Sequence, residues 1–210
     1  AEEARRFGIP DDLVIQIGNG IDTETFLPST SEQRAALRQT LKLPSHGVAV
    51  FIGRLSEEKN PVGLLEAWAL AQRRFRQPWT LAFVGDGPLR QSLERSVRRL
   101  GLEGNVVLAG QSKEVQNWLR AADVYVLSSH REGLSNTTLE AMATALPSVV
   151  TAVSGMAALV GAADAGLIVM CHTGFDIAFP RERRCDPVRV RHVMDELPEL
   201  KFVATHFGAW

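Results

Sequence analysis

Short runs of apolar, mostly β-branched residues alternate along the chain with longer amphipathic stretches, and this alternation constrains the fold more than any other feature. In such a pattern the short runs form parallel strands and the longer stretches form helices that cross over between them. The expected strands cover residues 13–17, 48–52, 80–84, 106–109, 124–127 and 148–151. The expected helices cover residues 32–43, 61–75, 89–100, 115–122 and 135–144. The pattern predicts an α/β fold with a Rossmann-like, doubly wound parallel sheet.

Overall composition restricts the class of partner. The chain has 210 residues, of which 45% are hydrophobic, so it can bury a core of its own. Its formal net charge is −1, which leaves no overall field that would attract a nucleic acid or an anionic membrane. With only two cysteines, a disulfide framework and a four-thiolate zinc site are excluded, and a reducing cytoplasm is expected. Any anion site must therefore be local.

The stretch 141–163 carries no charge and has to be considered as a membrane span. Several polar residues dilute it, and Pro147 divides it into a helix end and a short β-rich run, so no integral membrane segment is expected. The first residue is Ala1 in a charged stretch, without a signal-peptide pattern. We expect the chain to begin inside a longer protein.

The first candidate binding motif follows the strand at 48–52. Gly53 stands at the strand's carboxyl end, Arg54 comes next, and Lys59 follows five positions later. Arginine can bind a phosphate through two parallel hydrogen bonds, and lysine supplies a second, mobile charge. The motif indicates an anion site, although both cations could instead pair with Glu57 and Glu58 on a solvated loop.

The second candidate motif lies between the strand at 124–127 and the helix that follows it. A helix start placed there directs backbone N–H groups and the positive end of the helix dipole toward the cleft. A carboxylate near a helix start is favourable and accepts hydrogen bonds from sugar hydroxyls. In the alternative, the first glutamate only stabilises the dipole and the second lies on the surface. The residues concerned are Glu132, Gly133, Leu134, Ser135, Asn136 and Glu140.

Four motifs in this order and spacing characterise a known family. They are NGID at 19–22, GRLSEEKN at 53–60, VGDGP at 84–88 and SSHREGLSNTTLEAMATALPSVVT at 128–151. Together they closely resemble the C-terminal, nucleotide-sugar-binding domain of retaining GT-B glycosyltransferases of family 4. The resemblance extends from about residue 3 to Val169. It departs from the usual pattern at Gly18 and Ser128, where proline is frequent, and at Ala158, where glutamate is common.

The resemblance implies a role for each candidate residue. Arg54 and Lys59 would hold the donor diphosphate, together with the backbone N–H groups of the helix start formed by Leu134, Ser135 and Asn136. Glu132 would contact the donor sugar, and Glu140 would bind the ribose hydroxyls. Arg54, Lys59 and Glu132 would be the catalytic set.

The resemblance also implies what the protein needs besides these residues. The donor substrate would be a nucleoside diphosphate sugar, and no cofactor or metal would be required. An N-terminal, acceptor-binding domain would be missing, so this chain is expected to bind a donor weakly and to transfer sugar inefficiently. The full-length parent would be cytoplasmic, with association at the inner membrane left open.

The last part of the chain has a different character, which places a domain boundary between residues 1–167 and residues 168–210. Strands are expected at 167–171 and 201–205 and a helix at 187–197, as a β-α-β unit that adds parallel strands to the sheet or packs loosely at its edge. HTG at 172–174 and THFG at 205–208 resemble fragments of a metal-dependent amidohydrolase TIM barrel. The juxtaposition indicates a chimeric reading frame.

His172 and His206 are weak metal-ligand candidates, because each comes at the end of an expected strand. Even with Asp176 they are too few for the barrel's metal site, and ordinary packing histidines are the alternative. Three functional interpretations therefore remain open. The chain is a donor-binding half of a glycosyltransferase, an inactive nucleotide-sugar-binding remnant, or a metal-dependent hydrolase acting through its tail.

Overall fold

The computed structural model describes residues 7–8, 10, 20–133, 135–151, 153, 167–172, 175–176, 179–183 and 201–205. The strand predicted at 13–17 and the helix predicted at 187–197 lie outside the described residues.

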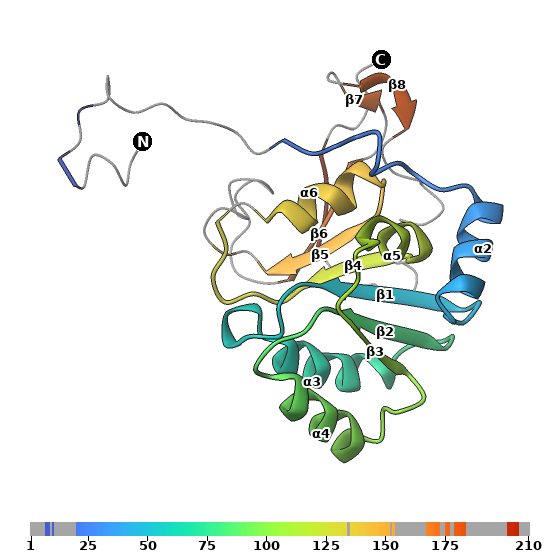
Figure 1. Cartoon of the computed structure of the whole chain (residues 1–210), viewed down its shortest axis with the longest axis vertical. Helices are drawn as coiled ribbons and strands as arrows, with labels where there is room; N and C mark the ends of the chain where they lie inside the picture. Colours follow the sequence, from blue (N-terminus) through green and yellow to red (C-terminus); the bar gives the residue numbers. More distant parts are fainter. Residues whose placement is uncertain are drawn as a thin grey trace.

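A seven-stranded sheet in the order β3-β2-β1-β4-β5-β6-β9 organises the molecule (Figure 1). Its first five strands are parallel to one another, which confirms the predicted doubly wound sheet. Each of these five strands overlaps a predicted one. They are β1 (Gly47–Ile52), β2 (Trp79–Val84), β3 (Val106–Gly110), β4 (Val124–Leu127) and β5 (Ser148–Thr151).

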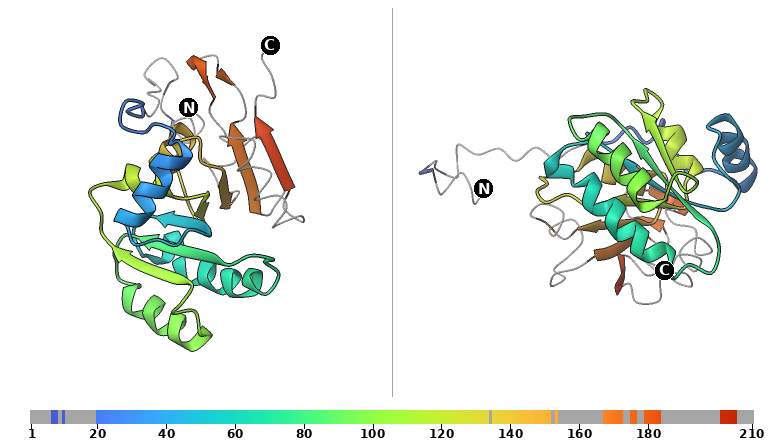
Figure 2. Two further views of the ribbon diagram at one scale, coloured as in Figure 1. Left: turned by 90° about the vertical axis from the view of Figure 1, so that its right-hand side faces the viewer. Right: turned by 90° about the horizontal axis from the view of Figure 1, so that it is seen from below.

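Helices cover both faces of the parallel strands. On one face α3 packs against α4, and Figure 2 shows the two side by side from below. On the other face α5 packs on β1 and contacts both α2 and α6. The helix bounds agree with the predicted ones to within a few residues. They are α2 (Ser31–Thr40), α3 (Pro61–Gln72), α4 (Arg90–Leu100), α5 (Val115–Ala121) and α6 (Asn136–Ala143), with a short 3-10 turn, η2 (Glu57–Lys59).

Side-chain caps fix the start of the two helices that follow the candidate motifs. Asn60 adopts a left-handed conformation, with φ 49° and ψ 50°, and its side chain accepts a hydrogen bond from Gly63 N at the start of α3. Pro61 occupies the first turn, where its missing N–H is not needed. Ser135 Oγ accepts a hydrogen bond from Thr138 N at the start of α6. Both helices therefore begin at positions set by the loops before them.

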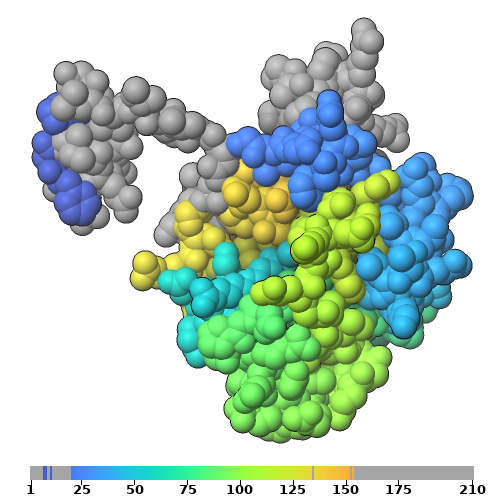
Figure 3. Space-filling view, in the orientation of Figure 1, coloured from blue at the N-terminus to red at the C-terminus, as the bar shows by residue number. Residues whose placement is uncertain are grey.

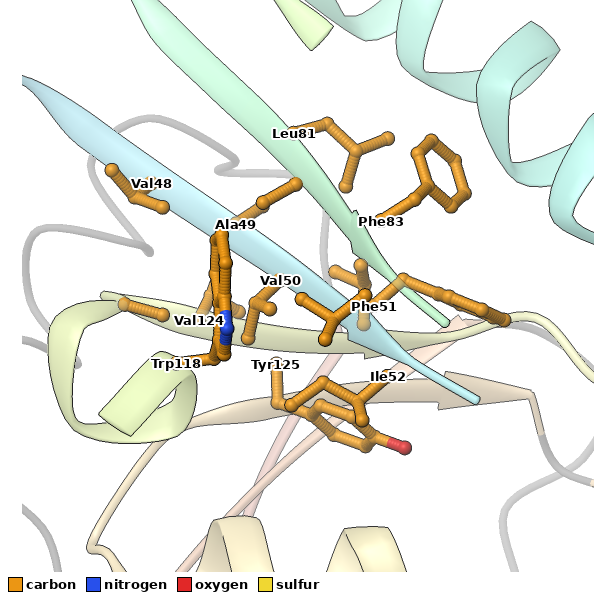
Figure 4. Packing of buried hydrophobic residues seen from close by; sticks show 14 of the residues in the cluster. Val48, Ala49, Val50, Phe51, Ile52, Leu81, Phe83, Trp118, Val124 and Tyr125 are labelled. Carbon is orange, nitrogen blue, oxygen red and sulfur yellow. The ribbon is translucent and has the colours of Figure 1, made fainter. Parts of the chain in front are cut away.

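The core lies between the sheet and its two helix layers. All residues of β1, β2 and β4 are buried, as expected for parallel strands covered on both faces. The rings of Phe51 and Phe83 on neighbouring strands are 5.4 Å apart (Figure 4). Trp118 of α5 and Tyr125 of β4 also belong to this cluster. The strands are thus held rigidly beneath the loops that leave their carboxyl ends.

A buried carboxylate joins α2 to the amino-terminal ends of β1 and β4. Asp123, just before β4, accepts hydrogen bonds from Arg38 Nη2 at 2.6 Å and from Arg34 Nη1 at 3.3 Å. It also accepts one from Val48 N of β1 at 2.8 Å. The side chains of the two arginines and of Asp123 are between 11% and 17% exposed. The cluster is therefore a structural clamp.

The strands after residue 166 join the sheet differently from the prediction. β6 (Leu167–His172) pairs antiparallel with β5, and β9 (Lys201–Thr205) pairs parallel with β6. The expectation of strands parallel to the sheet was wrong, because an antiparallel edge strand can follow β5 without a crossover helix. β7 (Phe175–Asp176) and β8 (Phe179–Arg183) form a two-stranded sheet between the strand expected at 167–171 and the helix expected at 187–197. Among the described residues, no helix is long and apolar enough to span a membrane.

Candidate functional site

The site lies where the strand order of the parallel sheet reverses. β2 and β3 extend from β1 in one direction, and β4 and β5 extend in the other, so that β1 and β4 are neighbours at the switch point. Ligands of doubly wound sheets bind beyond the carboxyl ends of the strands at this point. Both predicted motifs leave the sheet there, one after β1 and the other after β4.

The loops that follow β1, β2 and β3 are bonded directly to one another through their backbones. These bonds fix the three loops as one surface without the help of side chains. The hydrogen bonds are Gly53 N to Val84 O (3.0 Å), Leu55 N to Asp86 O (3.0 Å), Leu89 N to Leu55 O (2.9 Å) and Gly85 N to Gly110 O (2.7 Å).

Two glycines make this close approach of the loops sterically possible. Gly85 has φ 144°, and a Cβ atom added to it would lie 1.9 Å from the carbonyl oxygen of Gly53. A Cβ atom on Gly87 would lie 2.5 Å from the carbonyl oxygen of Leu55. Gly53 itself has room for a Cβ atom, whose nearest neighbour would be the Phe51 ring at 3.7 Å. Packing between loops thus requires glycine in the β2 loop, but not at position 53.

A cleft of about 690 Å³ opens above these loops, next to the start of α5. Figure 3 shows the face on which the segments after β1, β2 and β3 come together. Arg54, one of the predicted site residues, is exposed and lines the cleft, whereas the lining residues from the β3 loop and α5 were not predicted. The lining residues are Ile52, Gly53, Arg54, Val84, Gly85, Asp86, Gly87, Gln111, Ser112 and Val115.

An ion pair joins the two predicted motifs. Lys59 Nζ donates to Glu132 Oε1, and the same oxygen accepts a hydrogen bond from Ser129 Oγ at 2.9 Å. The Lys59 side chain is 26% exposed and that of Glu132 is 10% exposed. Lys59 therefore pairs across the switch point rather than with Glu57 or Glu58, so that alternative was wrong for Lys59.

Further hydrogen bonds hold the β4 loop against the β1 loop. Ser128 Oγ lies 3.0 Å from the carbonyl oxygen of Lys59 and 2.9 Å from that of Asn60. Its single hydroxyl hydrogen is therefore shared between these two carbonyl oxygens. The backbone N–H of His130 donates to the carbonyl oxygen of Glu58 at 2.8 Å. Position 128, where the sequence departs from the frequent proline, thus connects the two motifs directly.

The start of α6 completes the site. Ser135 is buried and caps the helix, and Asn136 is its exposed first residue. Leu134 lies outside the described residues. Gly133 is exposed, with open space where a Cβ atom would lie, so its role is not one of packing. Glu140 is half-buried in α6, and this burial raises the pKa of its carboxyl group.

The structure brings together some of the predicted residues and separates others. Lys59 and Glu132 are in contact, and Arg54 lines the cleft. Lys59, Glu132 and Glu140 are not among the residues that line it. The arrangement places cations and a helix start, which bind anions, beside carboxylates, which accept hydrogen bonds from hydroxyl groups.

Of the two predicted tail histidines, His172 lies away from the cleft. His172 is the last residue of β6. Because β6 runs antiparallel to β5, this residue lies at the amino-terminal ends of the parallel strands, opposite to the cleft. His206 lies outside the described residues. Within the described part of the chain, no group of three or more His, Cys, Asp or Glu side chains could hold a metal ion.

A Rossmann-like sheet with anion-binding elements at its switch point defines a nucleotide-binding type of α/β domain. The family model described as "Glycosyl transferases group 1" matches residues 46–177, more than half of the chain. The chain belongs to this family of glycosyltransferases. Its Rossmann-like sheet matches solved GT-B glycosyltransferase structures. The match extends past residue 167, and the boundary predicted there remains a prediction.

Two curated relatives illustrate the similarity. The putative teichuronic acid biosynthesis glycosyltransferase TuaC of Bacillus subtilis (strain 168) is 34% identical over 163 residues, covering 76% of this chain and 38% of the relative. The D-inositol 3-phosphate glycosyltransferase of Corynebacterium aurimucosum is 30% identical over 185 residues, covering 84% of this chain and 44% of the relative. The chain thus spans less than half the length of these relatives.

A solved structure supports the same class. Anabaena Alr3699/HepE, crystallised in complex with UDP and glucose, has 27% sequence identity and a TM-score of 0.65. The similarity covers 75% of this chain and 43% of that one. These relatives are all glycosyltransferases or share their fold, and they give no support to the hydrolase alternative or to a chimeric origin of the tail.

Proposed function

We propose that this chain is the donor-binding half of a retaining GT-B glycosyltransferase of family 4, and that it binds a nucleoside diphosphate sugar. The single observation that carries the proposal is the direct contact of Lys59 with Glu132, because it joins the two predicted motifs at the switch point of the sheet. The UDP bound to the related Anabaena protein supports a nucleoside diphosphate as the ligand.

The residues would act mainly by electrostatics. The reaction expels a nucleoside diphosphate, so negative charge accumulates on the leaving phosphate as the glycosidic bond breaks. Arg54 at the cleft and Lys59 in the same loop would neutralise this charge, together with the N–H groups at the start of α6. Protein cations in these positions would do this without a metal ion.

The two carboxylates would bind hydroxyl groups of the donor. Glu132 would contact the sugar, and Glu140, half-buried one turn inside α6, would bind the ribose. A carboxylate oxygen accepts hydrogen bonds from two or more hydroxyls, which suits it to a polyol. A donor phosphate near Lys59 would compete with Glu132 for the ammonium group and release the carboxylate toward the sugar.

Acceptor recognition would come from outside this chain. The curated relatives are more than twice as long as the part that matches, which leaves room for an N-terminal, acceptor-binding domain. We propose that efficient transfer with retention of the anomeric configuration requires that domain. Under this proposal, the present chain binds donors but turns them over poorly.

Calorimetric titration of the 210-residue chain with UDP, GDP and ADP, with the nucleosides as controls and EDTA present, tests the proposal. We expect one diphosphate to bind without metal and more tightly than its nucleoside. Arg54→Ala or Lys59→Ala should lower diphosphate affinity about tenfold, the effect of one charge-assisted hydrogen bond, and leave nucleoside affinity unchanged.

Arg95→Ala is the matched control, because Arg95 is an exposed arginine in the middle of α4 and not at the cleft. This variant should bind diphosphate and nucleoside like the unmodified chain. Equal losses for both ligands in Arg54→Ala and Lys59→Ala, or no binding of any diphosphate, would contradict the proposed function.

A further inference from the structure

Two buried hydroxyl groups beneath the donor site make no hydrogen bond of normal geometry with the described residues. They are Oη of Tyr125 on β4 and Oγ1 of Thr138 on α6, and both side chains are fully buried. Burying a hydroxyl without a partner costs free energy of folding, whereas phenylalanine would fill the place of Tyr125 without this cost. A function for the tyrosine hydroxyl therefore has to be sought in its surroundings.

The Tyr125 hydroxyl lies under the first turn of α6. Figure 4 shows it at the far end of the ring, away from β4. Burial raises the pKa of Tyr125, the nearby hydroxyls of Thr138 and Ser135 lower it, and the charges of Glu132 and Glu140 raise it further. The hydroxyl is thus close to two hydroxyl groups at the start of α6, and it is influenced by both carboxylates assigned to the donor.

The first turn of α6 is capped by a side chain in addition to its backbone hydrogen bonds. Ser135 Oγ accepts the N–H of Thr138 at 3.3 Å, so these two residues move together. Thr138 Oγ1 faces the core without a partner, and Tyr125 is the buried hydroxyl on the strand below it. Thr138 is close enough to Tyr125 for side-chain hydrogen bonding to lower the pKa of the tyrosine, so a slight local adjustment would let Tyr125 donate to Thr138 and satisfy both groups.

We propose that Tyr125 is a positioning residue for the donor site, and that its hydroxyl, with those of Thr138 and Ser135, holds the first turn of α6 in the geometry that receives a donor phosphate. The inference rests on the proposed function. It adds a residue of the sheet core to a site whose other members lie in the loops and in α6. A phosphate at the helix start attracts the turn through its N–H groups, and the hydroxyl pair then fixes where the turn comes to rest.

The test uses Tyr125→Phe in the 210-residue chain, titrated with UDP, GDP and ADP and with the corresponding nucleosides. We expect a three- to tenfold loss of affinity for the bound diphosphate, the effect of one hydrogen bond, and no change for the nucleoside. The melting temperature should not fall, since the variant removes an unpartnered buried polar atom. Thr138→Val should give a similar loss, and the double variant should lose little more than either single one.

Two control variants separate positioning from general packing. Thr138→Ser keeps the hydroxyl and should restore most of the diphosphate affinity. Thr144→Val removes a buried hydroxyl at the other end of α6, where Oγ1 donates to the carbonyl oxygen of Ala141 at 2.8 Å. It should lower the melting temperature and leave the ratio of diphosphate to nucleoside affinity unchanged.

The inference is overturned if Tyr125→Phe binds the diphosphate as tightly as the unmodified chain. It is also overturned if the variant melts earlier and loses affinity for diphosphate and nucleoside equally, because Tyr125 would then act only in packing. Failure of the unmodified chain itself to bind a diphosphate is a separate result, and it would refute the proposed function on which the inference rests.

Discussion

Replacing Glu132 with glutamine would remove the charge that holds Lys59 and keep the rest of the loop intact. The glutamine amide oxygen can still accept the hydrogen bond from Ser129 Oγ, which Glu132 Oε1 accepts at 2.9 Å. The substitution therefore changes one ion pair and not the shape of the site. We expect it to strengthen the binding of a nucleoside diphosphate that carries no sugar, because Lys59 no longer has to leave a carboxylate.

The size of the effect follows from the environment of the pair. Its side chains are 26% and 10% exposed, so the medium between them is less polarisable than water. At an effective dielectric constant of about 20, two charges 4 Å apart attract each other by about 4 kcal/mol, and loss of hydration offsets much of this. The net interaction free energy of the ion pair is then about 1–2 kcal/mol, and its removal corresponds to a gain in UDP affinity of about 5- to 30-fold.

Calorimetry with UDP and with UDP-glucose would measure this gain and separate the two roles given to Glu132. The gain should be smaller for UDP-glucose, because the variant also loses a carboxylate that is proposed to contact the sugar. Glu57→Gln is the matched control, since it removes an exposed carboxylate from the same part of the chain and shows how much long-range charge contributes. Unchanged or weaker UDP binding by Glu132→Gln, or an equal gain in Glu57→Gln, would refute the reasoning.

Three further predictions concern the scaffold and pH. Gly85→Ala should destabilise the fold by about 3 kcal/mol in urea denaturation, since its Cβ atom would meet the carbonyl oxygen of Gly53, while Gly104→Ala, with open space around it, serves as control. Asp123→Ala should cost about 3–5 kcal/mol of unfolding free energy by the same assay, because it leaves two largely buried arginines without their partner. Burial raises the pKa of Glu140 above 4.5, so its contribution to stability falls as pH rises through the interval between the unfolded and folded pKa values. Glu140→Gln should therefore raise the melting temperature at pH 7 and not below pH 4, and an equal shift at both pH values would contradict this.

The parallel strands could be predicted because each is a buried apolar run that ends in glycine, a charge or a turn. The run at 48–52, for example, becomes β1 almost unchanged. Helix ends could be predicted where a cap is local, as at Ser135 before α6. In these cases the information lies within a few residues of the element.

Contacts between distant segments could not be predicted in the same way. Lys59 and Glu132 are 73 residues apart, and only the neighbouring positions of β1 and β4 bring them together. The lining of the cleft by Gln111 and Ser112 depends on how the β3 loop packs. The direction of β6 was missed because an apolar run looks the same whichever way it pairs.

The backbone bonds that join the loops after β1, β2 and β3 limit how such a site can change. Each loop uses its own peptide groups to fix its neighbours, so an insertion or deletion in one would displace the other two. Substitution of side chains at the rim leaves these bonds in place. We therefore expect exchanges of whole loops with related enzymes to fail, and changes of donor preference to be obtained from point substitutions around the cleft.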